Sequence, residues 1–147
     1  MTFAHDGVRD NLTHLAAPPY FYENLRRELS SFQRSGRTFS LLRFALNSAA
    51  IVDPESEEGG ALIESAVLNF SQTINQSLRR EDLCARLGLT EFVLIVKGDE
   101  DLVPVIAHRV IASWSDDNFQ CLFSTVLASR GESPLDILNR LDNETLT

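Results

Sequence analysis

The chain has 147 residues, a formal net charge of −8 and 44% hydrophobic residues, which is typical of one soluble globular domain. Because binding to DNA or RNA depends on clustered Lys and Arg, this acidic composition argues against a nucleic acid polymer as partner. The sequence has no apolar run of ~18 residues and no signal peptide pattern, so we expect no membrane span and a cytoplasmic location.

The first half of the chain predicts a helix, a strand and a second helix. The Pro18-Pro19 pair can begin a helix, and apolar residues recur at helical spacing from there until Gly36 ends it. Residues 38–46 alternate and are rich in Phe and Leu, which indicates a strand. The hydrophilic segment 53–60 is interpreted as a solvated loop, and an apolar helical stripe follows it up to Leu78.

The second half predicts a hairpin, a helix, a strand and a last helix. Two short apolar runs, residues 83–87 and 92–96, are separated by a turn that contains glycine, which is a hairpin signal. Residues 102–114 are helical in pattern, residues 119–128 indicate a strand, and Ser133 can cap a final helix. Both cysteines lie in strand-like stretches and are interpreted as buried hydrophobic residues. This order predicts an α+β fold, in which helices pack over a mainly antiparallel sheet.

Short motifs occur along almost the whole chain. They are residues 10–15 (DNLTHL), 82–88 (DLCARLG), 91–96 (EFVLIV), 106–109 (IAHR) and 133–142 (SPLDILNRLD). Each is weak alone, but together they resemble the GGDEF, or diguanylate cyclase, family, whose domains contain DxLTxL, DLxARxG and EF at corresponding positions. Such domains resemble the polymerase palm, with an antiparallel-rich central sheet flanked by helices. They condense two GTP molecules into cyclic di-GMP as paired subunits.

The resemblance implies a single, degenerate GGDEF domain over residues 1–147, either free-standing or part of a larger signalling protein. The family takes one metal ligand from the first Asp of an FDxDxFKxxN stretch, and Ala45 occupies that position here. The residues at the family signature are Gly88, Leu89, Thr90, Glu91 and Phe92. Thr90 thus stands where the second metal-binding carboxylate is expected. Since Mg²⁺ requires hard oxygen ligands, we expect no metal site and no cyclase activity.

Two further positions concern substrate recognition. The family reads guanine with an Asn and a nearby Asp, and these positions correspond here to Asp53 and Gly60. The second glycine of the signature, which lets the backbone approach phosphates closely, is replaced by Leu89. Recognition of GTP is therefore expected to be weakened.

Arg79 and Asp82 form an RxxD sequence, with five residues between Asp82 and Gly88. Many GGDEF domains carry an inhibitory cyclic di-GMP site with this motif at this place. A guanidinium can pair with the O6/N7 edge of guanine, and a carboxylate can accept from its N1–H and N2–H₂ donors. Arg79 is predicted at the end of a helix and Asp82 at the start of a strand, so we expect both side chains to flank one exposed turn.

Arg109 matches the Arg of the family's AER string, where a partner subunit often completes the site. The resemblance thus implies a cyclic di-GMP receptor that uses Arg79, Asp82 and Arg109 and needs no cofactor. It would form a homodimer or a ligand-bridged dimer and signal to a protein effector. Three alternatives remain open. The first is an interaction or dimerisation scaffold, in which Arg79 and Asp82 form only a surface ion pair; the others are an allosteric GTP binder and a residual cyclase.

Overall fold

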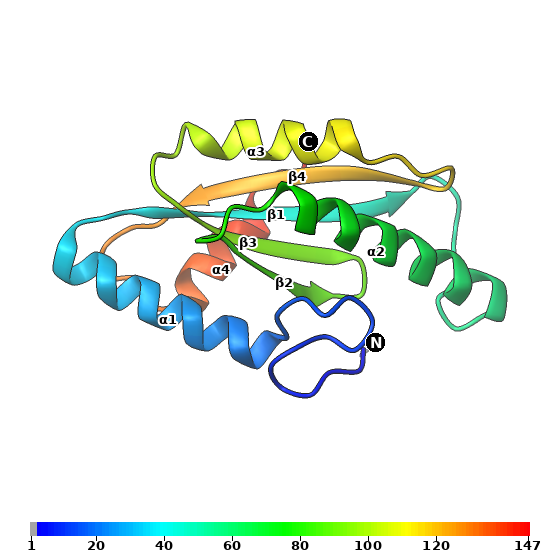
Figure 1. Ribbon diagram of the computed structural model, residues 1–147, viewed down its shortest axis with the longest axis horizontal. Coiled ribbons are helices and arrows are strands. Elements are labelled where there is room, and N and C mark those ends of the chain that lie inside the picture. Colours follow the sequence, from blue (N-terminus) through cyan, green and yellow to red (C-terminus); the bar gives the residue numbers. More distant parts are fainter. Residues whose placement is uncertain (1–2) are drawn as a thin grey trace.

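The computed structural model describes residues 3–147, which form a four-stranded sheet with helices packed on both faces (Figure 1). The elements are α1 (Pro18–Ser35), β1 (Phe39–Ser48), α2 (Glu57–Ser77), β2 (Leu83–Gly88), β3 (Glu91–Lys97), α3 (Leu102–Ser113), β4 (Phe119–Leu127) and α4 (Pro134–Asn143). The predicted order of helices and strands is confirmed, and so is the α+β fold. Within the described residues, no helix is long and apolar enough to cross a membrane.

The strands are ordered β2-β3-β1-β4, and each neighbouring pair is antiparallel. β1 is an inner strand, and its first eight residues are buried because both of its faces are covered. At the outer edge of β2, Ala16 exchanges backbone hydrogen bonds of 3.1 Å with Cys84 and Arg86. At the outer edge of β4, Phe123 and Thr147 exchange two backbone hydrogen bonds of 3.0 Å. Other segments of the chain therefore satisfy part of each sheet edge.

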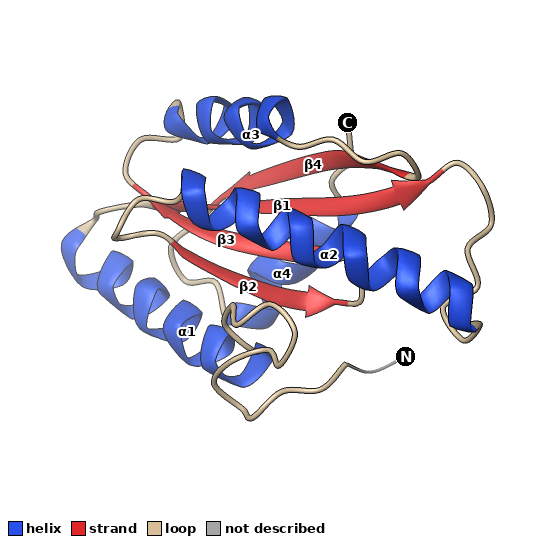
Figure 2. Cartoon of the chain, turned by 45° about the vertical axis from the view of Figure 1, so that its right-hand side comes forward, coloured by secondary structure: helices blue, strands red, loops and turns tan. Residues whose placement is uncertain are grey.

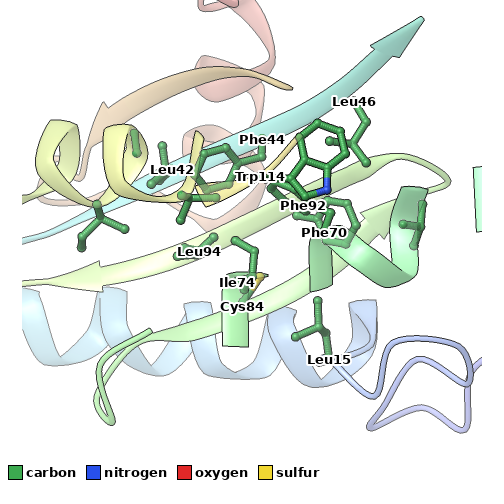
Figure 3. Close-up of a cluster of buried hydrophobic side chains, with 14 of the residues drawn as sticks. Leu15, Leu42, Phe44, Leu46, Phe70, Ile74, Cys84, Phe92, Leu94 and Trp114 are labelled. Atoms are coloured by element: carbon green, nitrogen blue, oxygen red, sulfur yellow. The ribbon is translucent and has the colours of Figure 1, made fainter. Parts of the chain in front are cut away.

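Two hydrophobic cores lie on opposite faces of the sheet, because alternate residues of each strand point to opposite sides. Helices α2 and α3 cover one face, while α1 and α4 cover the other (Figure 2). In the core under α2, the ring centroid of Phe70 lies 4.9 Å from that of Phe92 and 5.4 Å from that of Trp114 (Figure 3). These contacts hold the middle of α2 against the sheet and so fix the positions of its two ends.

The two cysteines are Cys84, which is buried in the same core, and Cys121, which is half-buried on β4. Burial raises the pKa of the Cys84 thiol, and it raises the pKa of the Cys121 thiol to about 12. Both thiols therefore stay protonated near neutral pH. This agrees with their interpretation as small hydrophobic residues.

Helix α2 begins at Glu57, so the prediction of a loop over residues 53–60 is wrong for its last four residues. Ser56 is the N-cap, and its hydroxyl accepts a hydrogen bond of 2.9 Å from the N–H of Gly59. The carboxylates of Glu57 and Glu58 lie in the first turn, where the helix dipole favours negative charge. Capping and charge thus start the helix earlier than its apolar stripe indicates.

The two glycines of this first turn differ in the space around them. A Cβ atom at Gly59 would overlap the carbonyl oxygen of Asp53, whereas at Gly60 the nearest atom, the carbonyl oxygen of Pro54, would be 3.4 Å away. We therefore expect Gly59→Ala to lower the free energy of unfolding by about 1–3 kcal/mol. Gly60→Ala should raise it by up to about 1 kcal/mol, because Ala favours the helix. Urea unfolding measures both values, and equal effects would contradict the close approach of the loop.

A buried ion pair joins the N-terminal segment to β2. The side chains of Asp10 and Arg86 are 0% and 4% exposed, and Arg86 Nη1 donates to Asp10 Oδ1 at 3.2 Å. Thr13 donates to the same carboxylate through its N–H at 2.9 Å and its hydroxyl at 2.8 Å. The other edge of Arg86 donates to the carbonyl of Leu89 through Nη2 at 2.8 Å and Nε at 3.3 Å. This network fixes the β2–β3 turn against the N-terminal segment.

Removal of the Asp10 carboxylate would leave the guanidinium of Arg86 buried without its counter-charge. We expect Asp10→Ala to lower the free energy of unfolding by about 3–5 kcal/mol, as when one partner of a buried ion pair is deleted. The control Asp117→Ala removes an exposed carboxylate and should change it by no more than about 0.5 kcal/mol. Urea unfolding followed by circular dichroism tests this, and equal losses in the two variants would contradict a structural role for the pair.

Candidate functional site

The RxxD turn lies between the end of α2 and the start of β2. The N–H of Asp82 donates to the carbonyl of Arg79 at 3.1 Å, which closes the turn. The Asp82 carboxylate accepts from Arg79 Nε at 3.0 Å and Nη2 at 2.8 Å, and from the backbone N–H of Arg79 at 3.2 Å. This bidentate hydrogen bonding to Asp82 raises the pKa of the Arg79 guanidinium. The two residues singled out by the motif are therefore in direct contact.

The two side chains of this turn differ in exposure. The side chain of Asp82 is 0% exposed, whereas that of Arg79 is 31% exposed. The expectation that both flank an exposed turn is therefore correct for Arg79 and wrong for the carboxylate of Asp82, because Arg79 covers it. Arg79 Nη1 lies 3.6 Å from Glu81 Oε1 in a longer ion pair. One edge of the guanidinium is thus held by Asp82, and the other faces outward.

Arg79 also connects the turn to the end of β3. Its Nη2 donates to the carbonyl of Lys97 at 2.7 Å, and Lys97 Nζ lies 2.8 Å from Glu28 Oε1 of α1. Lys97 lines a cavity of about 570 Å³, to which Glu28, Arg37 and Thr38 also contribute. An open volume with basic side chains therefore adjoins Arg79.

Arg109 lies on α3 with an exposed side chain. α2 and α3 cover the same face of the sheet (Figure 1), but none of the hydrogen bonds and ion pairs within residues 3–147 joins Arg109 to Arg79 or Asp82. Of the three ligand residues that the sequence predicts, two form a pair and the third stands apart on another helix.

The β2–β3 turn carries the segment from Gly88 to Phe92, beside the end of β1. In the register of β1 and β3, Ala45 lies opposite Glu91, and the N–H of Leu46 donates to the carbonyl of Thr90 at 3.0 Å. The side chains at this junction are a methyl group, a hydroxyl and one carboxylate. In the part of the chain that the structure describes, no three His, Cys, Asp or Glu residues are grouped so as to hold a metal ion. This donor set does not fit Mg²⁺, which prefers several carboxylate oxygens.

Two cavities flank the same turn and share Pro54, Ile63 and Leu89. One measures about 450 Å³ and is bordered by the N-terminal segment and the start of α2. The other measures about 420 Å³ and is bordered by the end of β1 and by Thr90. Gly60, at a predicted guanine-reading position, lines the first cavity, whereas Asp53 lines neither of them.

Sequence reasoning assigned no role to the residues that hold these sites in place. Asp10 and Arg86 are 76 positions apart, and both lie in motifs that indicated the family but not their contact. The carbonyl of Lys97 could not be found from side-chain chemistry, because a backbone acceptor leaves no trace in residue type. The signal available for the ion pair was one Asp and one Arg in predicted turn and strand segments.

Solved structures share the fold. SiaD, a diguanylate cyclase from Pseudomonas aeruginosa solved with its activator SiaC, has a TM-score of 0.79 and 23% identity over 92% of this chain and 55% of its own. The GGDEF domain of DgcB from Caulobacter crescentus, solved with c-di-GMP, has a TM-score of 0.79 and 17% identity over 97% of this chain and 87% of its own. The GGDEF domain of YfiN from Pseudomonas aeruginosa has a TM-score of 0.76 and 23% identity, with 91% and 84% covered. This chain thus spans about half the length of SiaD.

No curated protein sequence gives a significant match to this chain. A family model, in contrast, matches residues 8–117, and its description is "Diguanylate cyclase, GGDEF domain". The match includes the N-terminal DNLTHL segment, the RxxD turn and the β2–β3 hairpin. It therefore covers most of the chain, together with every structural feature of the candidate sites described above except the last residues of the sheet and α4. The chain belongs to the GGDEF family.

Proposed function

We propose that this domain is a catalytically inactive receptor for cyclic di-GMP, which binds at Arg79 with the help of Asp82 and Arg109. The observation that carries the proposal is the bidentate Arg79–Asp82 pair, which holds a partly exposed guanidinium beside a cavity of about 570 Å³. Cyclic di-GMP offers two guanine bases and two phosphodiester groups. Arginine suits both, because its planar fork pairs with the guanine edge and its charge attracts phosphate.

Asp82 has two roles open to it in this site. In the state described, its carboxylate accepts only from Arg79 and so orients the guanidinium. To accept from guanine N1–H and N2–H₂, it would have to exchange one or both of these hydrogen bonds for the ligand. Such an exchange conserves the number of charge-assisted bonds, and it selects guanine, because adenine lacks these donors.

Arg109 enters the proposal as a contact from a second subunit. Its exposed position on α3 leaves the guanidinium accessible to a ligand held by another copy of the chain. A cyclic di-GMP molecule has two equivalent faces, so it can bridge two domains in this way. The proposed receptor is therefore a homodimer or ligand-bridged dimer, and a change in association would carry the signal to a protein effector.

The absence of catalysis is proposed from the residues beside the β2–β3 turn. Transfer of a phosphoryl group from GTP requires metal ions that neutralise the phosphates, and carboxylates must hold those ions. Ala45 and Thr90 supply no carboxylate, and they lie next to each other as the family pattern requires. The relatives' structures support the ligand as well, since DgcB was solved with c-di-GMP.

Isothermal titration of cyclic di-GMP into the wild-type chain and two variants tests the receptor. Arg79→Ala should weaken binding by about 10–100-fold, the effect of losing one or two hydrogen bonds to a charged group. Arg80→Ala removes the neighbouring, exposed arginine and should leave affinity within about twofold, because single surface charges contribute little. Arg79→Lys keeps the charge but loses the bidentate fork, so it should resemble Arg79→Ala.

Circular dichroism must first show that Arg79→Ala is folded, because the variant leaves Asp82 buried without its partner. Wild-type binding that is unchanged in a folded Arg79→Ala variant would move the site elsewhere. No saturable heat with the wild-type chain would rule out the receptor and favour the scaffold, in which the ion pair is only structural.

Incubation with GTP and either Mg²⁺ or Mn²⁺ tests the inactive state. We expect no cyclic di-GMP by chromatography, while the DgcB domain under the same conditions provides the positive control. Because two metal-binding carboxylates are replaced, restoring only one of them, as in Ala45→Asp or Thr90→Asp, should not restore turnover. Any product from the wild-type chain that disappears on chelation would overturn the proposed inactivity.

A further inference from the structure

The cavity of about 450 Å³ beside the N-terminal segment lies far from the RxxD turn, and it is called the N-terminal cavity below. Gly60 and Glu64, near the start of α2, line it, whereas Arg79 follows the other end of that helix. An α-helix rises ~1.5 Å per residue, so the 21 residues of α2 separate the two places by roughly 25–30 Å. A ligand in this cavity would therefore not contact Arg79 or Asp82.

The charge of the N-terminal cavity is unlike that of a phosphate site. Arg86 lines it, but its guanidinium is neutralised by Asp10 and donates to the carbonyl of Leu89. The ring of Phe3 covers the guanidinium, with 4.5 Å between the ring centroid and Cζ of Arg86. Glu64 is the other charged lining residue and has an exposed side chain. The lining thus carries a net negative charge, which repels phosphate groups.

The shape and polarity of the cavity suit a flat heterocycle. Phe3 provides an aromatic ring at the wall, and Leu12, Ile63 and Leu89 provide apolar surface. Polar groups are few: the Glu64 carboxylate accepts hydrogen bonds, and the side-chain amide of Asn11 both donates and accepts. A volume of about 450 Å³ lies in the usual range for small-molecule sites. Apolar walls with a few polar groups are typical of sites that bind aromatic amines or nucleobases.

We propose that the N-terminal cavity binds a neutral or singly cationic nitrogen heterocycle, such as a nucleobase or nucleoside, and discriminates against nucleoside triphosphates. The heterocycle would donate from an exocyclic amine or ring N–H to Glu64 and pack against Phe3. This departs from the ligand that the family implies, because the lining lacks both free basic side chains and metal ligands. It does not depend on the RxxD turn, so it stands or falls separately from the cyclic di-GMP receptor.

Ligand-observed saturation-transfer NMR with adenosine, guanosine and cytidine, and with the corresponding triphosphates plus Mg²⁺, tests the proposal on the wild-type chain. We expect saturable binding of at least one nucleoside with a dissociation constant below ~1 mM. Its triphosphate should bind at least about tenfold more weakly, because phosphates meet a net negative lining. Binding by none of the nucleosides, or tighter binding of the triphosphates, would overturn the proposal.

Three variants locate the site. Gly60→Leu extends a side chain from a position where a Cβ is tolerated, and it should abolish nucleoside binding by filling the cavity. Glu64→Gln should weaken it about tenfold or more, since a hydrogen bond to a charged group is lost. Glu57→Gln removes an exposed carboxylate of the same helix that does not line the cavity, and should leave binding unchanged. Fluorescence of Trp114, the chain's single tryptophan, reports whether each variant keeps its core.

Arg79→Ala separates this site from the receptor site. Nucleoside binding should be the same in Arg79→Ala as in the wild-type chain, and saturating cyclic di-GMP should not displace the nucleoside. Loss of nucleoside binding in a folded Arg79→Ala variant, or retention of it in Gly60→Leu, would place the nucleoside outside the N-terminal cavity and contradict the proposal.

Discussion

The buried pair of Asp10 and Arg86 is the contact on which the rest of the arrangement depends. A guanidinium taken out of water is tolerated only when its charge and its donors are satisfied, and here a carboxylate and a backbone carbonyl satisfy them. The geometry of that satisfaction fixes three segments at once: the N-terminal turn, β2 and the β2–β3 turn. Since the turn also meets the end of β1, the pair sets the spacing of every group that borders the two cavities there.

Helix α2 places the two proposed sites at opposite ends of the molecule. Its middle is held by Phe70 in an aromatic cluster, so neither end can shift independently of the sheet. The end that begins at Glu57 carries the N-terminal cavity, and the end that leads into Arg79 carries the RxxD turn. A family known for one chemistry at the hairpin therefore offers, in this chain, two separate surfaces of different charge, one with an accessible guanidinium and one with an accessible carboxylate.

Periodicity and turn residues were sufficient to predict the order of all the helices and strands, because each element is long enough to display its own pattern. They failed at the start of α2, where Gly59 and Gly60 indicate a loop but Ser56 and two glutamates begin a helix. At the candidate site, Arg79 and Asp82 were predicted from their offset to the hairpin. Their mutual hydrogen bonding was only an alternative, because a sequence does not say whether an acid and a base face each other or a ligand. The Asp10–Arg86 contact, across 76 positions, needed the fold itself.

Lys97 has a consequence for how the domain responds to occupancy of the RxxD turn. Its carbonyl accepts from Arg79 while its ammonium pairs with Glu28 of α1, so one residue at the end of β3 belongs to both groups of contacts. A ligand that competes for Arg79 Nη2 removes a bond from the same residue that anchors α1. Thermodynamic linkage makes such coupling reciprocal: a force that moves α1 relative to β3 must alter the affinity at Arg79 by the same free energy. The helix that follows the N-terminal segment is thereby a natural place for an upstream protein to act.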